Sequence, residues 1–467
     1  MRRRTISRII ITALPLAVLL AMYGLWLFLD PPIYYESIIA ATLVLGIFAA
    51  IYIRLVPSVI SFYCDDVATI EKDELHMRTK RKCGAREILV LLSAIIVFRV
   101  AVILLGYWFF NKQFGYTCTF FSAQRMWSMW SDAPHYMAIA EHGYVAQSTA
   151  SESAHLTLVF LPFYSYVTKI FAFSGNYIRS GYFVSHISTI IGCVMLYQLV
   201  KIDFDRKTAR RAVKYFCILP AACLLYATMS DGMFFMLSVT ALYCARKKYI
   251  PLASLFSALA AYTRIIGVVL FLPIAMEYVY LLLQQRKQMG VERWRFVLKQ
   301  TLCGLSLLLI PLAIGVYMLQ NYAVSGNALQ FMTYQNENWS QSFSIFFRTP
   351  AYLTDYMIRD IASGNTAYVF GLSIPNLVYI FGSLSVLLIS INKMRVSYVA
   401  YFLAYFFIAT SVSWLLSGPR YLTCCFPLIL GLALVTKKKY VDIPLTILSL
   451  VGLVLYLYGF INGYQVF

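Results

Sequence analysis

The residues best suited to chemistry lie in one short segment, RMWSMWSDAPHYMAIAEHGY at positions 125–144, between long apolar runs. Within it, Asp132 is followed three residues later by His135, and at helical spacing both side chains lie on one face. The helix dipole favours an anion at the start of a helix, and an anionic carboxylate can accept a proton. The pair therefore predicts acid–base chemistry, with simple helix capping by Asp132 as the alternative.

Local signals set the bounds of the helix that carries this pair. Asp132 or the serine before it can serve as the N-cap, Pro134 suits the first turn, and Gly143 suits the C-terminal end. They predict a helix from about residue 133 to residue 142. Glu141 falls on the face opposite Asp132 at ~100° per residue. The two carboxylates should therefore not act as a pair.

Composition indicates an all-α integral membrane protein. Hydrophobic residues make up 61% of the 467 residues, and the mean hydropathy is +0.71, well above the apolar share of soluble domains. A net charge of +19 would suggest nucleic acid if the cations formed one patch, but they are dispersed between apolar runs. We therefore expect no nucleic-acid partner. The ten cysteines show no spacing typical of a metal site or a disulfide framework, so we expect no metal.

Thirteen apolar runs can be read as membrane-spanning helices, given the ~20 residues that a span needs. They lie at about 9–29, 34–55, 88–110, 180–200, 214–229, 232–245, 250–263, 265–283, 301–321, 367–391, 396–416, 421–435 and 441–461. With the N-terminus inside, 30 of the 39 Lys and Arg residues fall in interior segments. The positive-inside rule then fixes the orientation.

One apolar run, 156–173, is not counted as a span. Counting it would place the six cations of 201–214 outside. We therefore expect an interfacial or re-entrant helix there, with its aromatic side chains at the headgroup level.

This assignment divides the chain into three parts. Residues 1–87 hold two additional N-terminal helices and a cytosolic loop. Residues 88–321 form a transmembrane module with a large exterior loop at 111–178, which contains the polar segment. Residues 322–467 hold a second exterior loop, 322–366, and the C-terminal helices.

Several motifs in this order resemble the second mannosyltransferase of glycosylphosphatidylinositol assembly and its bacterial relatives, in the C-type glycosyltransferase superfamily. The segment DAPHYMAIAEHGY is similar to the family's W-D-x-x-H-F…I-A-x-x-G-Y, with Ser131 inserted between Trp130 and Asp132. The other matching motifs are Phe160-Leu161-Pro162, Ser230-Asp231, Thr263-Arg264-Ile265-Ile266-Gly267 and Gly418-Pro419-Arg420-Tyr421. The similarity covers about 88–435, and Asp231 stands where the family has Glu.

The resemblance implies an inverting transfer of a sugar, with mannose expected, from a polyprenyl-phosphate donor to an extracytoplasmic acceptor hydroxyl. The donor is a co-substrate, so no further cofactor is expected. A phosphate leaving group needs charge stabilisation, whereas the acceptor hydroxyl needs a base. Asp132 is the predicted base, and His135 would bind the phosphate or orient the acceptor, the alternative being a histidine whose hydrogen bonds are satisfied within the loop. Arg264 and Arg420 would pair with the phosphate, the alternative being arginines that snorkel to headgroups.

Further residues are candidates for substrate binding, each with a structural alternative. They are Arg125, Trp130, Tyr136, Glu141, His142, Asp231, Gln335, Trp339 and Tyr421. Asp231 could instead cap a helix, and Trp339 could instead serve the aromatic belt at the membrane surface. Arg99, midway along a span, requires a partner inside the bundle or access to water.

Two other functional classes stay open. A polysaccharide polymerase or ligase would share this fold, and a transporter would place ionisable groups near the bilayer midplane. Few charges are expected at the midplane here, which favours chemistry on a lipid substrate at the membrane surface. A bacterial plasma membrane is favoured, although the sequon at Asn338 leaves the endoplasmic reticulum open.

The cation distribution generates a topology prediction. A cysteine introduced within 202–212 should be shielded from an impermeant thiol reagent in intact cells, whereas one introduced at Ser148 should be labelled. Labelling of 202–212 from outside would mean that 156–173 crosses the membrane.

Overall fold

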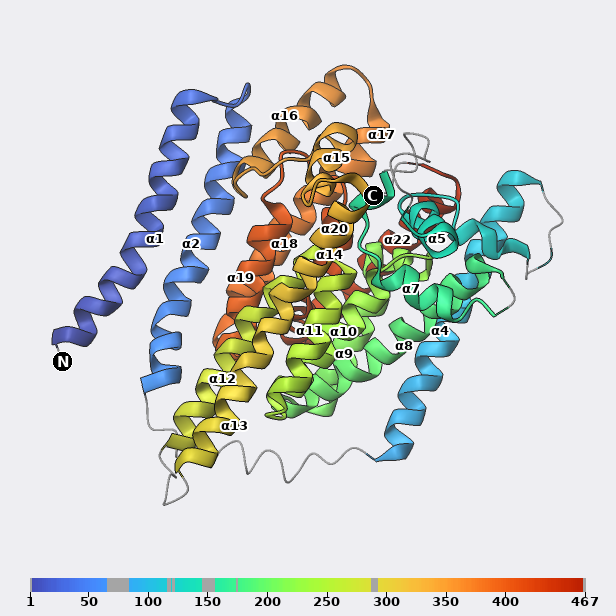
Figure 1. The fold of residues 1–467 in the computed structure, drawn as a ribbon. Helices are drawn as coiled ribbons and strands as arrows, with labels where there is room; N and C mark the ends of the chain where they lie inside the picture. The colour runs from blue at the N-terminus through green and yellow to red at the C-terminus, as the bar shows by residue number, and fades with distance from the viewer. Residues whose placement is uncertain are drawn as a thin grey trace.

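The computed structural model describes residues 2–64, 84–115, 119, 122–144, 156–173, 175–286 and 293–464. Within these ranges the chain forms a bundle of helices that runs through the molecule from top to bottom in Figure 1. Residues 65–83, which belong to the predicted cytosolic loop, and Ser148 lie outside the described residues.

The described residues contain eight helical segments that are long and apolar enough to cross a membrane. They are Ile10–Leu29, Tyr35–Tyr63, Ala85–Phe114, Tyr177–Asp203, Ile265–Gln284, Gln300–Ser325, Thr366–Lys393 and Lys439–Ile461. A ninth is reached if Pro220–Tyr226 and Asp231–Arg246, which meet at a bend of 102°, are taken as one span. The chain is thus an all-helical, multi-pass integral membrane protein.

The helices are named in chain order with the bounds that the structure gives. The α-helices are α1 Arg2–Leu29, α2 Tyr35–Cys64, α4 Ala85–Phe114, α5 Ala133–His142, α7 Phe163–Ile170, α8 Tyr177–Asp203, α9 Arg206–Ile218, α10 Asp231–Arg246, α11 Ile250–Thr263, α12 Phe271–Arg286, α13 Arg293–Leu305, α14 Leu309–Ser325, α15 Gln330–Trp339, α16 Arg348–Ala362, α17 Thr366–Tyr368, α18 Ile374–Ser390, α19 Val396–Thr410, α20 Gly418–Thr423, α21 Phe426–Val435 and α22 Lys439–Ile461. The 3₁₀ helices are η1 Ser122–Trp127, η2 Leu156–Val159, η3 Pro220–Tyr226, η4 Ile265–Leu270, η5 Ser306–Leu308 and η7 Ile391–Lys393, and η6 Val369–Ser373 is a π-helix.

The count of thirteen spans is not confirmed, and the run predicted as one span at 214–229 is not a single continuous helix. Leu219 is extended, with φ −57° and ψ 146°, and α9 ends just before it. Pro220 explains the break, because a proline disfavours helical geometry at the residue before it. Helices α11, α19 and α21 have 14, 15 and 10 residues, so they are too short to cross an average bilayer unaided.

The segment 156–173 forms the turn η2 and the eight-residue helix α7 rather than a span. The prediction that this run does not cross the membrane by itself is confirmed. Instead, α7 packs beside α5 and α8 at one end of the bundle. The hydroxyl of Tyr164 on α7 donates to the carbonyl of Gly181 on α8 at 2.9 Å.

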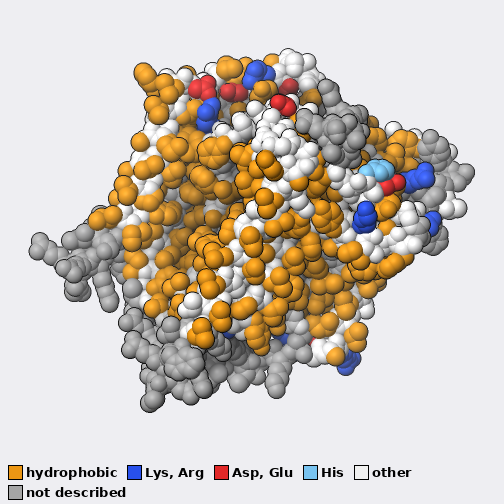
Figure 2. Space-filling model, viewed as in Figure 1, with side chains coloured by type: hydrophobic (Ala, Val, Ile, Leu, Met, Phe, Trp, Pro, Cys, Tyr) orange, Lys and Arg blue, Asp and Glu red, His pale blue; other side chains and the backbone are white. Residues whose placement is uncertain are grey.

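The outer face of the bundle is suited to lipid. Figure 2 shows hydrophobic side chains over the broad middle of this face, with the visible charged side chains near its upper, right-hand and lower margins. This distribution is the one that a bilayer requires of a polytopic protein.

Helix α10 lies at the centre of the bundle, against α8 and α11. At its start, Gly232 approaches α8 so closely that a Cβ there would lie 3.1 Å from the carbonyl oxygen of Ser185. At its end, Arg246 Nη2 pairs with Asp203 Oδ1 at 2.5 Å, and Arg246 Nη1 lies 3.5 Å from Glu277 Oε2. A buried charge therefore lies at each end of α10, an acid at the N-terminus and a base at the C-terminus, as the helix dipole favours.

Arg99, within α4, has partners inside the bundle. Its Nε donates to Nδ1 of His186 at 3.1 Å, and its Nη2 donates to the carbonyl of Leu225 at 3.1 Å. Its guanidinium carbon also lies 4.1 Å from the ring centroid of Tyr226. Arg99 is 95% buried, and neutral groups satisfy its charge through these contacts. The same contacts fix α4 to α8 and η3.

Candidate active site

Arg420, on the short helix α20, joins two carboxylates that are far apart in the sequence. Its Nε lies 2.9 Å from both Asp231 oxygens, and its Nη2 lies 2.7 Å from Asp231 Oδ2. Its Nη1 donates to Asp132 Oδ2. A fork of this kind can hold planar oxyanions in a fixed geometry.

Arg264, between α11 and η4, completes the cluster. Its Nη1 pairs with Asp231 Oδ1, and its guanidinium carbon lies 5.0 Å from the ring centroid of Tyr421. Asp132, Asp231, Arg264 and Arg420 are hereafter called the acid–arginine cluster. It contains two acids and two bases, so its formal charge is balanced.

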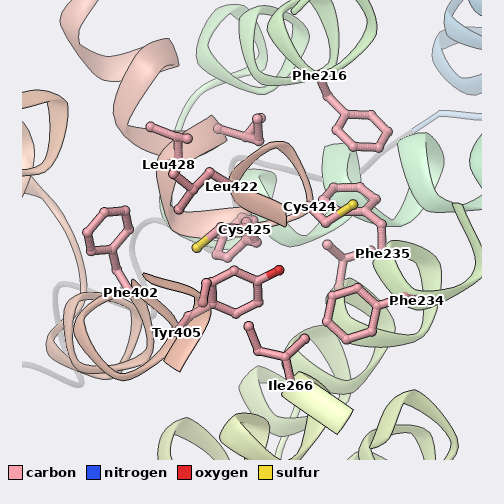
Figure 3. Packing of buried hydrophobic residues seen from close by; sticks show 14 of the residues in the cluster. Phe216, Phe234, Phe235, Ile266, Phe402, Tyr405, Leu422, Cys424, Cys425 and Leu428 are labelled. Atoms are coloured by element: carbon pink, nitrogen blue, oxygen red, sulfur yellow. The ribbon is translucent and has the colours of Figure 1, made fainter. Parts of the chain in front are cut away.

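The backbone around Arg420 is fixed from two sides. The N–H of Gly418 donates to Oδ1 of Asn376 on α18 at 2.9 Å, and a Cβ at Gly418 would clash with this amide oxygen. Figure 3 shows Leu422 and Cys424 beyond Arg420 in the same buried packing as Phe234 and Phe235 of α10. Hydrophobic contact thus brings the start of α10, where Asp231 lies, to the helix that carries Arg420.

Burial distinguishes the two carboxylates. The Asp231 side chain is 1% exposed and the Arg420 side chain 3%, whereas the Asp132 side chain is 27% exposed. The Arg264 side chain is 13% exposed, so neither arginine reaches outward as a snorkelling side chain would. Removing one partner of such a buried pair typically costs about 3–5 kcal/mol, because the other charge is left uncompensated.

The predicted helix at 133–142 is confirmed, with α5 beginning at Ala133 and ending at His142. Asp132 occupies the N-cap position, but its side chain makes no capping hydrogen bond. The alternative that Asp132 only caps the helix is therefore wrong, because its carboxylate pairs with Arg420 instead. On the next turn of α5, the Tyr136 hydroxyl shares a hydrogen bond of 2.7 Å with the hydroxyl of Ser230, the residue before Asp231.

His135 lies between aromatic rings from two parts of the chain. Its ring stacks on Phe160, with centroids 4.7 Å apart, and meets the edge of Trp339 at 6.3 Å. Burial lowers the pKa of His135, and the negative charge of Asp132 opposes this only in part. The imidazole is therefore held neutral at pH 7, which suits hydrogen bonding better than pairing with a phosphate anion.

Other candidate residues lie away from the acid–arginine cluster. Glu141 and His142 are exposed and face each other at 3.7 Å, which agrees with the predicted opposite face for Glu141. Arg125 is exposed, and Trp130 packs against Gly463 near the C-terminus.

The two candidates in the second loop, Gln335 and Trp339, make different contacts. The Gln335 amide donates to Gln341 at 2.5 Å, whereas Trp339 reaches the ring of His135. Trp339 thereby brings the second loop to the first. Asn376 was not predicted; its one sequence signal is a polar amide within the apolar run 367–391.

Comparison with known proteins gives similarity at the level of structure. No family model and no curated protein sequence matches the chain. ArnT from Cupriavidus metallidurans, solved bound to undecaprenyl phosphate, has 11% identity and a TM-score of 0.44, with 80% of this chain and 76% of that chain covered. The oligosaccharyltransferase of Archaeoglobus fulgidus has 12% identity and a TM-score of 0.39, with 79% of this chain and 53% of that chain covered. The predicted likeness to the glycosylphosphatidylinositol mannosyltransferase is not confirmed by these comparisons.

The stacked environment of His135 generates a prediction about its protonation. Because burial disfavours the charged ring, its pKa in the folded protein should lie below the ordinary ~6.5. The neutral form should therefore persist as the pH falls through 6.5 and be lost only at lower pH. Peptide-resolved carbethoxylation by diethyl pyrocarbonate, which modifies the neutral ring, measures this midpoint.

The control is Phe160→Ala, which exposes one face of the ring and should move the midpoint upward. Equal midpoints in both proteins, or a midpoint above 6.5 in the unaltered protein, would contradict the prediction.

Proposed function

We propose that this protein is a membrane glycosyltransferase that moves a sugar from a polyprenyl-phosphate donor to the hydroxyl of an extracytoplasmic lipid-linked or glycan acceptor. The observation that supports it best is the acid–arginine cluster, in which Arg420 bridges an accessible carboxylate, Asp132, and a buried one, Asp231. It combines a potential base with two guanidinium groups suited to phosphate.

Asp132 is assigned as the base because it is the accessible acid of the cluster. Asp231 is enclosed by Arg264 and Arg420 and is almost completely buried, so an acceptor hydroxyl has little access to it. Its role in the proposal is to hold both guanidinium groups in place. One base is enough for an inverting single displacement.

The donor phosphate and Asp132 compete for Arg420 in this mechanism. The cluster is charge-balanced without a donor, so an incoming phosphate anion takes over the Arg420 Nη1 contact and releases the Asp132 carboxylate. Asp132 then accepts the proton of the acceptor hydroxyl. The acceptor oxygen forms a bond to the anomeric carbon as that carbon's bond to the phosphate oxygen breaks. The bonding electrons and the negative charge remain on the phosphate, beside Arg264 and Arg420.

The sugar and the acceptor are assigned from the sequence resemblance. Mannose is the proposed sugar, and His135 with Trp339 is placed beside the reacting groups to orient the acceptor. The membrane is proposed to be a bacterial plasma membrane, with the cluster on the extracytoplasmic side.

A polymerase or ligase of the same fold would use the same cluster but yield a longer or transferred glycan. Mass spectrometry of lipid-linked glycans from cells with and without the protein separates these products. An unchanged glycan profile, together with movement of a solute across vesicles, would instead favour a transporter.

The competition for Arg420 predicts that one substitution reduces transfer without weakening donor binding. Asp132→Asn keeps the shape of the side chain and removes the base, so transfer should fall by about 10²-fold or more. Because a competing carboxylate is also lost, binding of undecaprenyl phosphate should be unchanged or tighter. Glu337→Gln, which alters an exposed acid in the second loop, is the matched control.

Near-normal transfer by a folded Asp132→Asn protein would reject Asp132 as the base and make Asp231 the next candidate. Weaker binding of undecaprenyl phosphate would reject the competition, even with transfer abolished.

The two arginines give a second prediction. Arg264→Lys and Arg420→Lys should each weaken binding of undecaprenyl phosphate by about 1–3 kcal/mol, since a point charge cannot reproduce a bidentate contact. Equilibrium binding to protein in nanodiscs measures the loss, and a thermal unfolding scan checks that the cluster still folds. Arg179→Lys, at an exposed site, should bind as the unaltered protein does. Unchanged affinity in both cluster variants would show that these arginines serve folding only.

A further inference from the structure

A large cavity adjoins the candidate active site and is separate from the acid–arginine cluster. Its volume is about 970 Å³, at the upper end of the ~300–1,000 Å³ typical of small-molecule sites. Three distant parts of the chain line it: the α1–α2 turn, the region from the end of α15 into α16, and the segment before α20. Its most distinctive lining residues are Trp26, Trp339, Tyr352, Tyr356 and Trp414.

The walls of the cavity are held by specific hydrogen bonds. Asp355 on α16 accepts from Ile33 N at 3.3 Å, from Tyr34 N at 3.2 Å and from Ser37 Oγ at 2.6 Å. This fixes the α1–α2 turn to α16.

The opposite wall is held in a similar way. Ser344 N donates to Ser411 O at 3.1 Å, and Ser413 N donates to Ser342 O at 2.9 Å. These bonds join the second loop to the segment before α20. Because these hydrogen bonds fix its walls, the cavity is not a gap between loosely placed loops.

The lining has the chemistry of a carbohydrate site. Trp414 stacks on Tyr352 with ring centroids 5.7 Å apart, and Tyr356 meets the edge of Trp414 at 4.9 Å. Such a platform can pack against the C–H face of a sugar ring. Serine hydroxyls and Asn338 beside it can exchange hydrogen bonds with sugar hydroxyls.

Charge argues against the phosphate-bearing donor as the occupant. The charged lining residues are two acids, Asp30 and Asp355, and one base, Arg348, which already pairs with Asp30. A lining with a surplus acid and no unpaired arginine repels an anionic phosphate. A neutral or amino sugar meets no such penalty.

The cavity also lies next to the proposed chemistry. Trp339 lines it and meets the ring of His135, and Trp414 precedes Arg420 by six residues on a segment fixed to the second loop. A glycan seated in the cavity can therefore extend past Trp339 and His135 toward Asp132.

We propose that this cavity is the binding site for the glycan part of the acceptor, with the α1–α2 turn as one wall. The proposal rests on the proposed glycosyltransferase function and adds the chemical class of the acceptor, a neutral or amino oligosaccharide. It also gives the N-terminal helices a role in forming the site.

Binding can be tested without turnover. The full-length protein in nanodiscs is titrated with three free trisaccharides, mannotriose, cellotriose and chitotriose, and with the dodecyl glycoside of each. Calorimetry follows binding. We expect at least one probe to bind, and Trp414→Ala to weaken it by about tenfold or more, because a large aromatic contact is lost. Trp108→Ala, which alters an exposed tryptophan of α4 outside the cavity, should bind as the unaltered protein does.

The possible outcomes distinguish the proposal that the cavity binds a glycan from the proposal that Asp132 is the base for transfer. Binding that Trp414→Ala weakens, and that persists in Asp132→Asn, supports the cavity whether or not transfer depends on Asp132. Tight binding of a dodecyl glycoside alone identifies a glycolipid acceptor, whereas equal binding of the free trisaccharide identifies a free glycan end. Failure of all six probes to bind, or binding that Trp414→Ala leaves unchanged, overturns the proposal while leaving the role of Asp132 intact.

Discussion

The contact on which the site depends is the buried ion pairing of Arg420 with two carboxylates at once. Asp132 lies 288 residues and Asp231 189 residues from Arg420 in the sequence. One guanidinium therefore draws the segment that carries α5, the start of α10 and the C-terminal part of the chain to a single point. In a low-dielectric interior none of these charges can be left unpaired without a large cost. The network thus makes the placement of α5, α10 and α20 mutually dependent.

The structure on either side of the Arg420 ion pairing helps to hold this contact in place. Below it, the aromatic packing of α10 against the segment after Arg420 excludes water (Figure 3). Above it, Phe160 and Trp339 enclose His135 and bring the two large loops together. Buried apolar packing and the acid–arginine cluster therefore lie side by side, with Asp132 as the accessible member of the cluster.

Local signals in the sequence predict local structure well. They do not predict which side chains pair when these are far apart in the sequence. The proline, the glycine and the capping residue predict the bounds of α5, because each acts on its own turn. The same cues could not show that Asp132 turns to Arg420 rather than to its own helix. Arg99 was recognisable as a charge in need of a partner, but His186 is recognisable as that partner only once α4 and α8 are packed. The helix break at Leu219 could have been predicted from Pro220. It was missed because the apolar run 214–229 looks like one continuous span.

The length of α10 has a consequence for the depth at which the proposed donor phosphate would bind. Its 16 residues separate the charge cluster at Arg246 from the one at Asp231 by only ~22 Å at 1.5 Å per residue, whereas a bilayer's hydrocarbon core is ~30 Å thick. If the Arg246 cluster lies at one boundary of the core, Asp231 lies about 8 Å or more inside the other. In the proposed reaction, a polyprenyl phosphate must then sink its headgroup below the plane of its neighbours, or the bilayer must thin locally around the protein. The lipid carrier would reach the site sideways from the membrane, and the water-soluble part of the reaction would come to it from above.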